Sequence, residues 1–78
     1  MSWTQELLEE LQLLSLFPVN SLQEGLKIHS NAEPARIAAA RRLFGKGLIT
    51  QEDGGYLTTL GQEAAKQVQS LKMKLAAS

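Results

Sequence analysis

One stretch in the middle of the chain, GLITQEDGGYLTTLG at residues 47–61, constrains the fold most strongly. Two short apolar runs, LIT at 48–50 and YLT at 56–58, flank an Asp-Gly-Gly turn at 53–55. Glycine and aspartate tolerate the backbone angles of a tight turn, so this pattern predicts a β-hairpin. An isolated hairpin is barely stable in water, and the rest of the chain must therefore supply an apolar surface for it to cover.

The first part of the chain is expected to form two helices. Leucines recur at intervals of three and four residues over residues 4–16, with glutamates on the opposite side, and this spacing predicts a first helix that ends before Pro18. A second helix is expected to begin at Asn20 or Ser21 and to stop near His29, where a turn-like cluster follows.

A third and a fourth helix are expected on either side of the hairpin. Pro34 suits the first turn of an alanine-rich helix over residues 34–46. Gly47 is expected to end this helix in a Schellman motif, because glycine adopts the left-handed conformation that the motif needs. One of two adjacent threonines, Thr58 or Thr59, caps the last helix. Its apolar stripe comprises Leu60, Ala64, Val68, Leu71 and Leu75.

These elements predict a single domain over residues 1–78 with one core. The chain is 44% hydrophobic and 21% charged, which is the composition of an ordinary globular domain. The expected core joins the apolar faces of the four helices and the hairpin, and comprises Leu7, Leu11, Leu14, Leu22, Leu26, Ile37, Phe44, Leu48, Leu57, Leu60, Ala64 and Val68.

The order of these elements is that of a winged helix. The segment LFGKGLITQEDGGYLTTLG resembles the signature of winged helix-turn-helix regulators, in which the recognition helix ends in Gly-Leu-Ile (here 47–49) and the wing ends in Leu-Thr-x-x-Gly (here 57–61). This resemblance implies a mainly helical fold with three helices, a two-stranded wing and a C-terminal helix. Nearly the whole chain also resembles a family of short bacterial proteins of unknown function, through LLEELQLLSLF, QEGLKIH, RRLFGKGLIT and DGGYLTTLG.

Charge is unevenly distributed along the chain, although the net charge is zero. Residues 1–26 carry four acidic residues and no basic one. Residues 27–50 carry five basic residues and one acidic residue, a net charge of +4. A basic middle third is one feature that nucleic-acid-binding proteins use.

The winged-helix resemblance implies that the helix over 34–46 enters the major groove of double-stranded DNA. At about 100° per residue, Arg42 and Lys46 lie on the face opposite Ile37 and Phe44. Three alanines share that outward face: Ala35, Ala38 and Ala39. We therefore predict a DNA-binding protein, a small bacterial transcriptional regulator. Its expected DNA contacts are Arg42, Lys46, Arg36, Arg41 and Lys27.

Two features favour a different role. The hairpin tip carries Glu52 and Asp53, which would repel phosphates, and the arginines can instead pair with the acidic first helix. The alternative is a winged-helix protein-interaction module that does not bind DNA, with Leu71, Leu75, Leu13 and Phe17 as its candidate residues. The stripe of the last helix can also pair with its twin in a homodimer, or simply fill the core.

No residue pattern predicts catalysis, a cofactor or a metal site. His29 is the only histidine, and the chain has no cysteine. The Gly-Lys-Gly at 45–47 lacks the glycine spacing and the hydroxyl residue of a phosphate-binding loop. We expect a protein that is not an enzyme and needs no cofactor. Because there is no apolar run of about 20 residues and no secretory signal, we also expect a cytoplasmic location without membrane contact.

Overall fold

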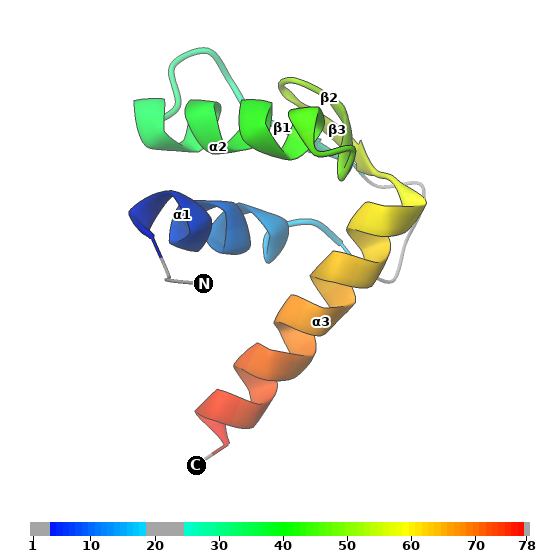
Figure 1. Cartoon of the computed structure of the whole chain (residues 1–78). Coiled ribbons are helices and arrows are strands. Elements are labelled where there is room, and N and C mark those ends of the chain that lie inside the picture. Colours follow the sequence, from blue (N-terminus) through cyan, green and yellow to red (C-terminus); the bar gives the residue numbers. More distant parts are fainter. Residues whose placement is uncertain (1–3, 19–24, 78) are drawn as a thin grey trace.

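The fold is mainly helical, with a small antiparallel sheet. The computed structural model describes residues 4–18 and 25–77. Its elements are α1 (Gln5–Leu14), β1 (Leu26–Lys27), α2 (Pro34–Gly45), β2 (Ile49–Gln51), β3 (Gly54–Leu57) and α3 (Thr59–Ala76). α2 packs on α1, whereas α3 runs diagonally from the sheet, and its C-terminal end lies on the side of α1 remote from α2 (Figure 1).

A strand occupies part of the segment for which a second helix was predicted. Leu26 and Lys27 pair antiparallel with Gly55 and Gly54 of β3, so the sheet order is β1-β3-β2. The prediction is therefore wrong for the residues of β1, and residues 19–24 lie outside the described residues. Glycine permits this pairing because a Cβ atom on Gly54 would lie 2.1 Å from the Leu26 carbonyl oxygen. The sheet consequently has three strands instead of the two that were predicted.

The predicted C-terminal end of α2 is confirmed in detail. Gly47 has φ 76°, and its N–H donates to the Phe44 carbonyl at 3.0 Å. The Leu48 N–H donates to the Leu43 carbonyl at 3.0 Å. These two bonds make a Schellman motif, which turns the chain directly into β2.

The hairpin and the start of α3 are also confirmed. The N-cap of α3 is Thr58, whose Oγ1 accepts from the Gly61 N–H at 3.0 Å. The same hydroxyl donates to the Gly47 carbonyl at 2.6 Å. Thr58 thus joins the first turn of α3 to the end of α2, and this junction fixes where α3 leaves the sheet.

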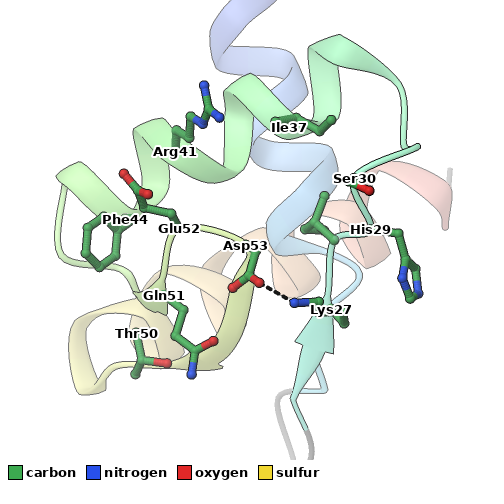
Figure 2. A pocket seen from close by; sticks show the side chains of 11 residues that line it. Lys27, His29, Ser30, Ile37, Arg41, Phe44, Thr50, Gln51, Glu52 and Asp53 are labelled. Atoms are coloured by element: carbon green, nitrogen blue, oxygen red, sulfur yellow. Dashed lines mark hydrogen bonds and ion pairs between the residues drawn. The ribbon is translucent and has the colours of Figure 1, made fainter.

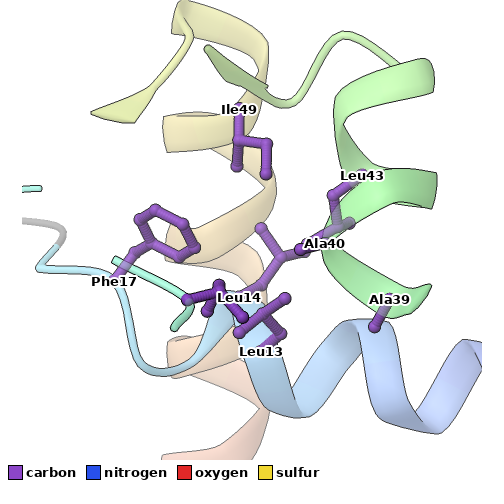
Figure 3. Close-up of a cluster of buried hydrophobic side chains, with 8 residues drawn as sticks. Leu13, Leu14, Phe17, Ala39, Ala40, Leu43 and Ile49 are labelled. Atoms are coloured by element: carbon purple, nitrogen blue, oxygen red, sulfur yellow. The ribbon is translucent and has the colours of Figure 1, made fainter. Parts of the chain in front are cut away.

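The core lies between α1, α2 and the sheet (Figure 3). It contains Leu13, Leu14, Phe17, Ile28, Ala39, Ala40, Leu43 and Ile49, and Leu26, Ile37, Leu48, Leu57, Ala64 and Val68 pack against it. The core assignment is wrong for Phe44 and Leu60, which are 42% and 54% exposed. Leu7 and Leu11 are half-buried, and Leu22 lies outside the described residues.

The error at Phe44 comes from the rotation of α2 about its own axis. Ala39, predicted on the outward face, is fully buried, together with Ala40 and Leu43. An alanine-rich helix shows little difference in hydrophobicity between its faces. Ile37 and Phe44 were therefore a poor guide to the side of α2 that is buried. The buried alanines allow the backbones of α1 and α2 to approach closely.

Gly61 is expected to be irreplaceable although it lies within a helix. A Cβ atom there would lie 1.9 Å from the Leu48 carbonyl oxygen. We expect Gly61→Ala to lower the free energy of unfolding by about 1–3 kcal/mol, despite the better helix propensity of alanine. The matched control is Gly45→Ala on α2, where nothing lies within 4 Å of the added atom; it should be neutral or stabilising by about 0.5–1 kcal/mol. Urea unfolding of both variants measures the difference, and equal effects would contradict the close contact.

Candidate functional site

The side chains of Arg42 and Lys46 on α2 point toward α1. Glu10 of α1 is only 5% exposed. The Arg42 Nε–H donates to Glu10 Oε2 at 2.7 Å, and Lys46 Nζ donates to Glu10 Oε1. Each carboxylate oxygen therefore has its own cationic donor. The two residues that were predicted to make the central DNA contacts therefore pair with a buried carboxylate of the first helix, and their own side chains stay partly exposed.

Two further acidic residues surround Arg42. Its Nη2 donates to the Glu6 carbonyl at 3.2 Å, its Nη1 lies 3.7 Å from Glu6 Oε2, and its Nη2 lies 3.6 Å from Glu9 Oε1. We call Glu6, Glu9, Glu10, Arg42 and Lys46 the ion cluster. It links the helices on one side of their contact, and the apolar core lies on the other.

The ion cluster changes the protonation behaviour of Glu10. Burial by itself would raise the pKa of Glu10, but the hydrogen bonds from Lys46 and Arg42, together with their charges, lower it below the ordinary value of 4.5. The hydrogen bond to Glu10 also raises the pKa of Arg42. Both groups are therefore charged at neutral pH, and the pair persists.

The remaining three predicted DNA contacts have different surroundings. Lys27 on β1 forms an ion pair with Asp53 at the hairpin turn, and its hydrogen bond lowers the pKa of Asp53. Arg36 and Arg41 on α2 are exposed and, within residues 4–18 and 25–77, have no carboxylate at ion-pair distance. The structure thus leaves two exposed cations on α2 without a carboxylate at ion-pair distance among the described residues. They lie on different sides of the helix: Arg36 lines a hollow with residues of α1, and Arg41 lines a groove beside the hairpin turn.

A wide polar groove separates α2 from the hairpin turn. It has a volume of about 780 Å³. α2 contributes Ile37, Arg41 and Phe44, while Glu52 and the Lys27–Asp53 pair lie on the opposite wall (Figure 2). His29 also lines it. Because both cations and carboxylates line this groove, it offers no surface of one sign for an anion such as DNA.

A second groove, between α1 and α3, is almost entirely apolar. It has a volume of about 320 Å³. Leu8 and Leu11 form one wall and Val68, Leu71 and Leu75 the other, with Gln12, Ser15 and Lys72 at the edges. The Gln69 side chain donates to the Ser15 carbonyl at 3.1 Å and fixes the end where the two helices meet. We call this feature the α1–α3 groove.

Of the four residues that were predicted for protein interaction, two are buried and two are exposed. Leu13 and Phe17 are buried in the core and offer no surface to a partner. Leu71 is 50% exposed and lines the α1–α3 groove with Leu75. Leu8, which completes the groove on α1, was missed as an interaction residue. Its spacing of three from Leu11 is a signal that the sequence does contain.

No group of three or more His, Cys, Asp and Glu side chains within the described residues has an arrangement that could hold a metal ion. None of the helices in this part of the chain is long and apolar enough to cross a membrane.

Comparison with known proteins places the chain in a family. The family model described as a family of unknown function (DUF5669) matches residues 1–76. The chain belongs to this family. The match extends over α1, α2, α3 and all three strands, and it confirms the expected resemblance to an uncharacterised family. No curated protein and no solved structure matches the chain.

The ion cluster predicts a specific loss of stability in acid. Because the pKa of folded Glu10 is below its ordinary value of 4.5, the stabilisation is present above that pH and is lost as the pH falls through the folded pKa. Glu10→Gln should lower the free energy of unfolding at neutral pH by about 1–3 kcal/mol and make it less dependent on pH below about 4.5. Urea unfolding between pH 7 and pH 3 tests this. Glu63→Gln, at an exposed position on α3, is the control; if both variants follow the wild-type curve, the cluster is not formed.

Proposed function

We propose that this chain is a protein-interaction module that binds an amphipathic helix in the α1–α3 groove. One observation carries this proposal: leucines on two facing helices line an apolar groove, and Leu71 is half exposed although it continues the stripe that packs into the core. Contiguous exposed apolar surface on a small protein commonly marks a binding site.

The shape of the groove suits a helix better than an extended peptide or a small ligand. Its walls are two helices, so leucines of a third helix can insert between the ridges of both. Burial of each half-exposed leucine contributes about 1 kcal/mol. The polar edges at Gln12, Ser15 and Lys72 can form hydrogen bonds around an apolar centre, which is the usual arrangement of an interface.

We also propose that the fold of this chain is a winged helix. The order of a helix, a strand, a second helix, a hairpin and a last helix supports it, as does the Schellman turn that leads from α2 into the hairpin. In a winged helix α2 would hold the recognition position. Winged helices serve protein binding as well as DNA binding, so the assignment is compatible with the α1–α3 groove as the working surface.

DNA binding by α2 is a second candidate, favoured by Arg36 and Arg41. Both are exposed on the helix that precedes the hairpin, and neither has a carboxylate partner among the described residues. In this candidate they would contact phosphates, whereas Arg42 could reach a base only by leaving Glu10. Glu52 at the hairpin turn would oppose the approach of the duplex.

A titration with a model helix is expected to support the first candidate. The probe is a blocked amphipathic peptide of leucine and lysine, added to the ¹⁵N-labelled chain. Amide shifts should follow the α1–α3 groove, and Leu71→Glu should weaken binding at least about tenfold, because it places a charge in the apolar contact. Leu60→Glu is the matched control, since Leu60 is equally exposed on α3 but outside the groove. Equal losses in both variants would contradict the assignment.

A titration with a random-sequence duplex tests the second candidate. If α2 binds DNA through Arg36 and Arg41, shifts should concentrate on α2 and fade with salt, with a slope of about −2 in a log–log plot of affinity against salt concentration. Arg41→Glu should then abolish the shifts, while Lys66→Glu, on α3, should not. The absence of shifts at low salt would exclude DNA binding by α2.

A further inference from the structure

We infer that the helix bound by the α1–α3 groove is acidic: its ridge of apolar side chains is flanked by glutamates or aspartates. This inference rests on the proposed function, because it names the chemistry of the partner that the same groove takes. Two observations carry it: the charge of the side chains that line the groove, and the separation of the lysines of α3 from the glutamates of α1.

The charge at the groove itself is positive. Of the described residues that line the groove, only Lys72 is charged, and it lies at the edge. Lys72 is exposed, and within residues 4–18 and 25–77 no carboxylate lies at ion-pair distance from it. A carboxylate of a partner can therefore pair with this ammonium group without breaking an existing ion pair.

The surrounding part of α3 has the same sign of charge. After Glu63, this helix carries three lysines and no acidic residue: Lys66, Lys72 and Lys74. At about 100° per residue, Leu71 lies between Lys72 and Lys74 around the helix axis. Both lysines are exposed, so the leucine ridge of α3 is flanked by cations on its two sides.

The glutamates of α1 do not offset these lysines at the groove. Glu6, Glu9 and Glu10 do not line it, because they are engaged with Arg42 and Lys46 in the ion cluster, where α1 packs on α2. The wall that α1 contributes consists of uncharged side chains. A bound helix therefore meets one neutral wall and one positive wall, and such a surface attracts carboxylates and repels lysines.

The leucines and the lysines have separate roles in this recognition. Leu8 and Leu71 are 41% and 50% exposed and offer an apolar contact to any helix with a leucine ridge. They do not distinguish an acidic helix from a basic one, whereas Lys72 does. Ion pairs at an exposed edge are weak, so the expected preference for an acidic helix over a basic one is only about fivefold.

Three matched peptides test the inference. Each is a blocked amphipathic helix with the same leucine ridge, and its polar positions are all glutamate, all glutamine or all lysine. At about 50 mM salt, affinity for the ¹⁵N-labelled chain should fall in that order, and the glutamate peptide should bind about fivefold more tightly than the lysine peptide. At about 1 M salt the ratio should fall below about twofold, because the Debye length is then only about 3 Å.

A variant of Lys72 separates the charge of the groove from the properties of the peptides. Lys72→Met keeps an apolar side chain of similar length, so it should retain binding of the lysine peptide but reduce the fivefold preference to about twofold. Lys66→Met is the matched control, because it removes the same charge from α3 at a position that does not line the groove. Equal preferences in the two variants would overturn the inference.

The outcomes also separate the inference from the proposed function. If all three peptides shift the amides of the groove with equal affinity, or if the lysine peptide binds most tightly, the acidic partner is wrong and the interaction module stands. If none of the peptides binds, both are overturned. A glutamate peptide that binds most tightly but shifts amides outside the groove would also overturn the inference.

Discussion

The buried carboxylate of Glu10 is the interaction on which the remaining structure depends. A charge that is nearly excluded from water is tolerable only when it is paired and hydrogen-bonded, and Arg42 and Lys46 supply both requirements. Their side chains reach Glu10 only if one particular side of α2 turns toward α1. That rotation places Ala39 and Ala40 against α1 and leaves Phe44 exposed. The buried charge and the apolar packing are therefore both satisfied in the observed orientation of α2.

This arrangement also decides which surfaces remain for function. The basic middle third of the chain is partly neutralised within the molecule's own ion pairs, because three of its five cations pair with Glu10 or Asp53. Among the described residues, Arg36 and Arg41 are the cations of α2 without a carboxylate at ion-pair distance, and they lie on different sides of the helix. Meanwhile α3 leaves the sheet at an angle set by Thr58 and Gly61, so it diverges from α1 and opens the apolar α1–α3 groove. The α1–α3 groove is therefore an apolar surface that the fold leaves open to solvent.

The features that the sequence predicted correctly are those that nearby residues determine. Pro34 begins α2 and Gly47 follows its end, the glycines at 54 and 55 form the hairpin turn, and Thr58 caps α3. Each of these features depends on interactions within a few residues. The family was also recognisable from its motifs. What local patterns could not supply was β1, because two residues paired with glycines of a distant hairpin leave no periodic signal. The rotation of α2 was equally hidden, since it depends on a carboxylate 32 residues earlier. The α1–α3 groove depends on how α1 and α3 are placed relative to each other, and the pattern of a single segment cannot predict this placement.

A double-mutant cycle between Glu10 and Arg42 tests the central claim most directly. The free energy of unfolding would be measured for the wild type, Glu10→Gln, Arg42→Met and the double variant, at low and at moderate salt. If the pair is buried as described, the coupling free energy should be about 1–3 kcal/mol and nearly independent of salt. A coupling below about 0.3 kcal/mol would contradict the internal pairing. Arg42 would then be free on the surface of α2, and DNA would replace the helix partner as the better-supported ligand.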